Sequence, residues 1–108
     1  MEQLMQEEII EGLRNIFKDK LVSIVLFGSY ARGTNTSESD IDIAIILNQE
    51  YDRESRDKVI DLAVDIDLKY DTVLSIVDIN YDKFIEWQEV LPFYKNVKKD
   101  GVLLWNAA

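Results

Sequence analysis

The sequence contains no cysteine and no histidine. Without cysteine, disulfides and thiolate zinc sites are excluded, and a cytoplasmic location is the expectation. Without histidine, the chain lacks the commonest general base and the commonest protein ligand for metal ions. Any catalysis must therefore depend on carboxylates, hydroxyl groups and a bound metal ion.

Basic residues are also few. Against 21 Asp and Glu the chain has 12 Lys and Arg, which gives a formal net charge of −9. This acidity argues against general nucleic-acid binding, because neutralisation of phosphates supplies most of that affinity. It suits a cationic partner or a site for divalent cations, although solubility is the simpler explanation. No apolar run is long enough to span a bilayer, and the acidic start MEQLMQEEII lacks the basic region of a signal peptide.

The remaining pattern mixes helices with strands. Apolar residues recur at helical spacing in the longer segments, and short β-branched runs lie between them. The single proline, Pro92, interrupts the last helical stretch. The pattern predicts helices at about 2–17, 53–70 and 81–90, strands at 21–27, 40–47 and 72–79, a last helical turn at 93–101, and an edge strand or docking tail at 102–105. This mixture predicts an α/β (α+β) fold, a small mixed sheet with helices packed on it, as one domain over residues 1–108.

Two parts of this assignment have alternatives. The stretch VDIDL, Val64 to Leu68, alternates like a strand, but the apolar residues before it have helical spacing and it lacks aromatic residues, so helix is preferred. The polar loop at 28–39 is too short for a full crossover helix. The strands on either side of it are therefore adjacent and antiparallel, or are joined by a one-turn helix.

The segment from Phe27 to Ile45, FGSYARGTNTSESDIDIAI, places two acids at the start of an apolar run. Asp40 and Asp42 are two residues apart, and alternate residues of a strand point to the same face of a sheet. Two carboxylates held this close repel one another and need compensation. Mg²⁺ supplies it, since proteins commonly hold this ion with one or two carboxylates plus the phosphates of a substrate.

Gly28 and Ser29 add a candidate phosphate-binding element. A glycine at the end of a strand permits unusual dihedral angles and close approach of the backbone. The N–H groups that follow, together with the Ser29 hydroxyl, can bind an anion, and Arg32 can reach a phosphate. Each motif alone is common in solvated turns and strand starts. Their combination beside two apolar strands favours phosphoryl or nucleotidyl transfer.

Ten residues separate Ser29 from Asp40. Gly28-Ser29 followed at this spacing by Asp40-Ile41-Asp42 resembles the signature of the DNA polymerase beta-like nucleotidyltransferase superfamily. The surrounding sequence resembles its small prokaryotic branch, the minimal nucleotidyltransferases, over nearly the whole chain. The resemblance implies the nucleotidyltransferase fold, ATP as substrate and Mg²⁺ as cofactor. It implies that Gly28 and Ser29 bind phosphates and that Asp40 and Asp42 ligate the metal.

The resemblance also implies a third carboxylate. Fully active members carry one on the next core strand, often as the general base on the attacking hydroxyl. The stretch DTVLSIVDI has no acid in its middle. Asp71, at its start, is the candidate, because the start of a parallel strand lies at the same end of the sheet as Asp40. Asp78 would lie at the other end, and Asp65 and Asp67 qualify only if their segment is a strand.

Two functions follow. Small proteins of this branch are often antitoxins paired with a HEPN-domain ribonuclease toxin, which they modify by transferring AMP from ATP to a tyrosine, or neutralise by binding. The first function is therefore Mg²⁺-dependent AMP transfer to a hydroxyl group of such a partner. The second is a catalytically weak nucleotide-binding module that acts by direct contact, which the missing third acid favours.

The C-terminal aromatic residues are expected to pack the last helix or to form a partner surface: Trp87, Phe93, Tyr94 and Trp105.

Overall fold

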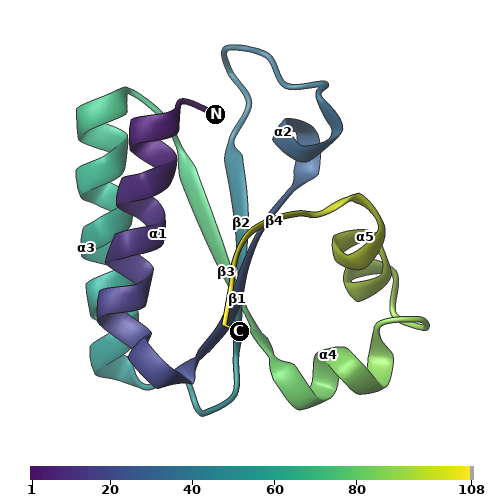
Figure 1. The fold of residues 1–108 in the computed structure, drawn as a ribbon. Coiled ribbons are helices and arrows are strands. Elements are labelled where there is room, and N and C mark those ends of the chain that lie inside the picture. The colour runs from purple at the N-terminus through teal and green to yellow at the C-terminus, as the bar shows by residue number, and fades with distance from the viewer. Residues whose placement is uncertain (108) are drawn as a thin grey trace.

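The computed structural model describes residues 1–107, and the chain folds into helices on both faces of one sheet (Figure 1). In chain order the elements are α1 (Gln3–Phe17), the short 3₁₀ helix η1 (Lys18–Lys20), β1 (Leu21–Phe27), α2 (Gly28–Arg32), β2 (Ile41–Leu47), α3 (Arg53–Tyr70), β3 (Leu74–Asn80), α4 (Tyr81–Trp87), α5 (Pro92–Asp100) and β4 (Val102–Asn106). The predicted α/β fold class is confirmed. No helix within residues 1–107 has both the length and the apolar character needed to cross a membrane.

The four-stranded sheet has the order β3-β2-β1-β4. β1 lies antiparallel to both β2 and β4, whereas β2 and β3 are parallel. Strands β1 and β2 are adjacent and also joined by the short helix α2, so both alternatives for this connection are present together. β4 confirms the predicted C-terminal edge strand. The parallel pair brings the starts of β2 and β3 to the same end of the sheet, since the backbone N–H of Ile41 donates to the carbonyl of Val73.

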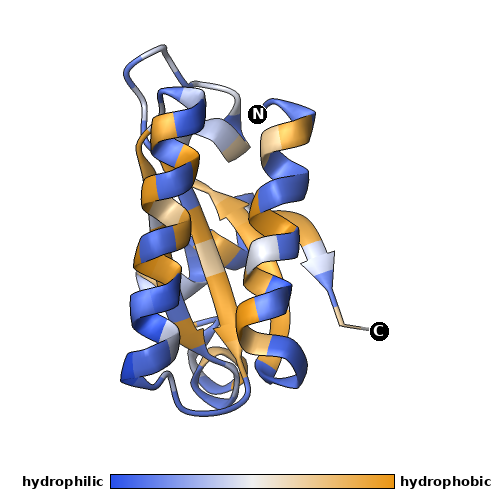
Figure 2. Cartoon of the chain, turned by 90° about the vertical axis from the view of Figure 1, so that its left-hand side faces the viewer, coloured by the Kyte–Doolittle hydropathy of each residue, from blue (hydrophilic) through white to orange (hydrophobic). Residues whose placement is uncertain are grey.

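Helices α1 and α3 pack side by side over one face of the sheet (Figure 1). The strands behind them are largely apolar, while apolar and hydrophilic residues alternate along the two helices (Figure 2). This pattern places one face of each helix in the core and the other in water. The first core includes the fully buried side chains of Ile9, Leu13, Ile24, Ile43 and Ile45.

Helices α4 and α5 cover the opposite face of the sheet and enclose a smaller core (Figure 1). Val25, Ala44, Ile46 and Ile79 point into it from the strands, and Val97 enters it from α5. Side chains of a strand alternate between faces. The even-numbered residues of β2 therefore face α4 and α5, which decides the side on which Asp42 lies.

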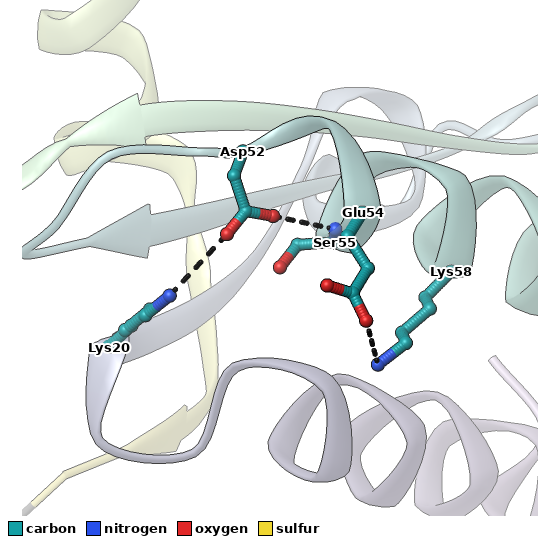
Figure 3. Close-up of polar contacts among 5 residues, drawn as sticks. All are labelled: Lys20, Asp52, Glu54, Ser55 and Lys58. Atoms are coloured by element: carbon teal, nitrogen blue, oxygen red, sulfur yellow. Dashed lines mark hydrogen bonds and ion pairs between the residues drawn. The ribbon is translucent and has the colours of Figure 1, made fainter.

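Caps and ion pairs fix the start of α3 (Figure 3). The Asp52 carboxylate accepts a hydrogen bond from the backbone N–H of Ser55 at 2.7 Å and forms an ion pair with Lys20 at 3.6 Å. Glu54 pairs with Lys58 one turn along the helix at 3.5 Å. N-terminal caps of this kind typically stabilise a helix by about 1 kcal/mol. The helix thus begins at the predicted residue, Arg53.

The stretch 64–68 is helical, as preferred, and the strand alternative is wrong. The carboxylate of Asp67 accepts hydrogen bonds from the backbone N–H of Leu74 at 2.8 Å and from the Thr72 hydroxyl at 3.2 Å. Asp67 therefore ties the end of α3 to the start of β3, which is a structural role.

The C-terminal half differs from the prediction in extent. α4 ends at Trp87, and the predicted last turn is a helix of nine residues that starts at Pro92. Proline is well placed at the first position of a helix, because the N–H group that it lacks has no partner there. The prediction that the C-terminal aromatic residues pack in the core holds in part. Tyr94 packs edge to face on Phe84 in the second core, and Trp105 packs against the first. Trp87 and Phe93 are exposed.

Candidate functional site

The turn from β1 into α2 brings Gly28 against the carboxylate of Asp42. Gly28 has φ +73°, a conformation that residues with a side chain rarely adopt. A Cβ atom at this position would lie 2.3 Å from Oδ2 of Asp42. Both the backbone conformation and the space beside it therefore require glycine. A close approach of another group to the backbone is what a glycine at the end of a strand permits.

Asp42 lies near the beginning of β2, opposite Phe27 of β1 and beside Ser75 of β3. Its side chain is partly buried on the α4 and α5 face of the sheet. Burial raises the pKa of Asp42 above its ordinary value of 3.8, the negative charge of Asp40 raises it further, and Arg32 lowers it in part. The site thus holds two acids close enough to interact, with one of them in an unfavourable environment for its charge.

The other predicted phosphate-binding residues lie on α2. Ser29 is the second residue of this helix, and exposed Arg32 is its last. Gly33 ends the helix with φ 75°, in the left-handed region. Arg32 lies near enough to Asp42 for its positive charge to lower the pKa of that carboxyl. The structure therefore brings the residues Gly28 to Arg32 to the same end of the sheet as Asp40 and Asp42.

Asp71 is not brought together with this pair. It ends α3 with φ 53° and lines a separate cavity of about 170 Å³ with Tyr30 and Ser39. It lies at the predicted end of the sheet, but α3 covers the face opposite to that of Asp42. On the Asp42 side, the neighbouring residue of β3 is Ser75. Among residues 1–107, no three His, Cys, Asp or Glu side chains are arranged to hold a metal ion.

Asp40 and Asp42 nevertheless fit Mg²⁺. Both are hard oxygen donors, and one or two carboxylates with substrate phosphates are a common ligand set for this ion. The raised pKa of Asp42 shows that its negative charge lacks full compensation in the protein alone. A divalent cation between the two acids would supply that compensation.

A second cavity adjoins the site and was not foreseen from the sequence. It measures about 220 Å³ and lies between α2 and α5, where its lining includes Phe27, Gly28, Arg32, Phe93, Asn96 and Asp100. The signal in the sequence was the spacing of Phe93, Asn96 and Asp100, which share one face if the segment after Pro92 is a helix of two turns or more.

The sequence also matches a known protein family. The family model described as Nucleotidyltransferase domain matches residues 7–103. The chain belongs to this family. A Methanocaldococcus jannaschii protein named "Putative protein adenylyltransferase" is 35% identical over 102 residues, which cover 92% of this chain and 93% of that protein. The Shewanella oneidensis protein adenylyltransferase MntA is 35% identical over 91 residues, which cover 84% of this chain and 63% of MntA.

Solved structures of the same family have the same fold. A crystal structure of a toxin–antitoxin with AMP-PNP aligns with a TM-score of 0.65 and 30% identity, over 94% of this chain and 73% of the other. A structure of the tri-AMPylated Shewanella oneidensis HEPN toxin in complex with MNT antitoxin aligns with a TM-score of 0.62 and 28% identity, over 99% of this chain and 74% of the other. The expected nucleotidyltransferase fold is therefore confirmed.

Proposed function

We propose that this nucleotidyltransferase-family protein transfers AMP from ATP to a tyrosine hydroxyl of a HEPN-domain ribonuclease toxin and so acts as its antitoxin in the cytoplasm. The observation that carries this proposal is the position of Gly28 against the Asp42 carboxylate, beside Asp40 and Arg32. This arrangement puts a candidate phosphate-binding turn and a candidate metal-binding pair in direct contact. The names of the relatives support the choice of AMP and of a HEPN partner.

In this reaction the hydroxyl oxygen of the acceptor attacks the α-phosphorus of ATP, and the bond to the β-phosphate oxygen breaks to release pyrophosphate. Asp40 and Asp42 would hold Mg²⁺, which when bound neutralises phosphate charge and orients the reacting groups. Gly28 lets the backbone approach the phosphates, and the Ser29 hydroxyl and Arg32 donate hydrogen bonds to them. The candidate from the sequence for accepting the proton of the hydroxyl is Asp71, but Asp71 lines a separate cavity at the end of α3 and does not lie beside Asp40 and Asp42.

A protein acceptor suits the charge of the chain. The net charge of −9 disfavours a nucleic-acid acceptor, whose phosphates would be repelled, and is compatible with a cationic protein surface. The competing function is neutralisation by binding alone. The absence of a third acid beside Asp40 and Asp42 among the described residues favours that alternative.

The test is incubation of the protein with labelled ATP, Mg²⁺ and the HEPN-domain protein encoded next to it. We expect the wild-type protein to label the partner and the double variant Asp40→Asn/Asp42→Asn to lose labelling. The matched control is Asp61→Asn/Asp65→Asn, which changes charge equally on the exposed side of α3. Labelling that persists in the first double variant would remove the assignment of these acids.

Growth of cells that express the toxin distinguishes the two functions. If the first double variant binds the toxin and still protects the cells, binding is sufficient and catalysis is dispensable. If it binds without protecting, AMP transfer is the protective activity. Co-purification of the variant with the toxin supplies the binding measurement in both cases.

A further inference from the structure

The cavity between α2 and α5 opens directly beside the candidate phosphate-binding turn. Gly28 and Arg32 contribute to its wall from α2, and α5 supplies the opposite wall. Its volume, about 220 Å³, is below the 300–1,000 Å³ typical of pockets that enclose a whole small-molecule ligand. The cavity therefore suits one part of a ligand whose remainder lies outside, next to Gly28.

The wall formed by α5 combines one aromatic residue with two polar ones. Phe93, Asn96 and Asp100 are spaced by three and four residues, so they follow one another along a single helix face. Phe93 and Asn96 are exposed, and Asp100 is half-buried. None of these three side chains accepts or donates a hydrogen bond among those found in residues 1–107. Their polar groups are available to a ligand.

Phe93 is held in place although it is exposed. Its ring lies 5.6 Å from that of Phe27 and 5.9 Å from that of Tyr94, measured between centroids. It follows Pro92, whose fixed backbone angle starts the helix. With 38% of its surface exposed, Phe93 offers a positioned aromatic surface in the lining of the cavity. Such surfaces bind the flat faces of nucleobases, because every base has an aromatic face.

We propose that this cavity binds the base and ribose of the nucleoside triphosphate, with the base stacked on Phe93. The proposal rests on the proposed function, since it concerns the same nucleotide. The carboxamide of Asn96 both donates and accepts hydrogen bonds, which matches the amino group and ring nitrogen on the edge of adenine. The carboxylate of Asp100, an acceptor only, suits a ribose hydroxyl. The phosphates then extend past Gly28 toward Asp40 and Asp42.

The test measures binding of three probes by calorimetry in the presence of Mg²⁺: ATP, ITP and inorganic tripolyphosphate. ITP carries an oxygen where ATP has the amino group of adenine, and tripolyphosphate has neither base nor ribose. We expect Phe93→Ala to weaken ATP binding about tenfold, the size of one lost base-stacking contact, and to leave tripolyphosphate binding unchanged. Phe93→Tyr should bind ATP like the wild-type protein.

Two further variants separate the roles in the cavity. Asn96→Ala should reduce the preference for ATP over ITP, while leaving tripolyphosphate binding unaltered. Tyr81→Ala is the matched control, because Tyr81 is an aromatic residue of α4 with a similar exposure of 39% that does not line the cavity. It should bind all three probes like the wild-type protein.

Several outcomes would overturn the proposal. Unchanged ATP binding in Phe93→Ala, or an equal loss of ATP and tripolyphosphate, would show that the base does not stack there. If Phe93→Ala binds ATP normally but requires a higher concentration of the toxin for labelling, the cavity receives the acceptor instead. Failure of the proposed function has a different signature, since the wild-type protein would then not label its partner with AMP, whatever Phe93→Ala does to ATP binding.

Discussion

The carboxylate of Asp42 lies so close to Gly28 that a Cβ atom at that position would be 2.3 Å from its Oδ2 atom. Gly28 is the first residue of α2, directly after β1, and Asp42 lies on β2, which pairs antiparallel with β1. A substitution at Gly28 would therefore displace an acid that the proposed reaction needs. The comparison with Gly33 isolates this effect, because Gly33 has nearly the same φ, 75° against 73°, and has no atom within 4 Å of its Cβ position.

We expect Gly33→Ala to destabilise the protein by about 1–2 kcal/mol, the cost of a left-handed backbone for a residue with a Cβ atom. Gly28→Ala should cost more than this and should also abolish AMP transfer, since Asp42 must move. Urea denaturation and the labelling assay measure the two effects. Equal behaviour of the two variants would show that the contact with Asp42 is unimportant.

Replacement of Asp42 should stabilise the protein without ligands. Its pKa is raised in the folded state, so the folded protein binds the proton more tightly than the unfolded chain does. The free energy of unfolding therefore falls as the pH rises from 3.8 through the raised pKa, and the ionised group is destabilising above it. We expect Asp42→Asn to be more stable than the wild-type protein near neutral pH, with the difference shrinking in acid. Denaturation of both proteins across this pH range measures it. If Asp42→Asn is less stable than the wild-type protein at neutral pH, burial and the charge of Asp40 do not destabilise the ionised Asp42 carboxylate as inferred.

Binding of Mg²⁺ should weaken as the pH falls through the raised pKa of Asp42, because metal ligation requires the ionised carboxylate. The measurement is the increase in melting temperature that Mg²⁺ with ATP produces, from about pH 8 down to about pH 4. The negative charge of Asp40 helps to raise the pKa of Asp42. In Asp40→Asn, the remaining effect of Mg²⁺ on the melting temperature should therefore persist to a lower pH than in the wild-type protein. An effect of Mg²⁺ that is independent of pH would exclude these ligands.

The role of Asp71 as general base has a direct test in Asp71→Asn. Asparagine tolerates the left-handed backbone at this position, φ 53°, so the variant removes the charge and little else. If Asp71 accepts the proton of the attacking hydroxyl, we expect labelling to slow by about 100-fold or more while ATP affinity stays the same. Asp78→Asn, toward the other end of β3, is the control. An unchanged labelling rate would show that Asp71 is not the general base and only ends α3.

The structural role assigned to Asp67 predicts a loss of stability. Its carboxylate accepts two hydrogen bonds that connect α3 to β3. Asp67→Ala leaves the partly buried backbone N–H of Leu74 without its partner and should cost about 1–3 kcal/mol. Asp65→Ala, an exposed neighbour on the same helix, should change stability by less than about 0.5 kcal/mol. Equal effects in urea denaturation would show that the two hydrogen bonds contribute little.

Local patterns predicted most of the secondary structure. The β-branched run of β1 and the helical spacing of α3 gave elements with the same bounds as those observed. Local signals fail where an element depends on its packing. The segment before Gly101 was expected as a last helical turn, whereas α5 is a helix of nine residues in which Val97 alone is buried. Its length depends on packing against β1 and α4, which no local pattern reports.

By itself, the sequence determined which residues form the turn and the acidic pair, because Gly28-Ser29 and Asp40-Ile41-Asp42 are defined by residue type and by the spacing of ten residues between them. Tertiary structure alone decided their mutual position. Antiparallel pairing of β1 with β2 puts Asp42 against Gly28, and the alternation of side chains places it on the face covered by α5. The same alternation separates it from Asp71, at the end of a helix on the other face. Contacts between segments far apart in the chain depend on sheet order and side-chain direction, which a linear pattern does not contain.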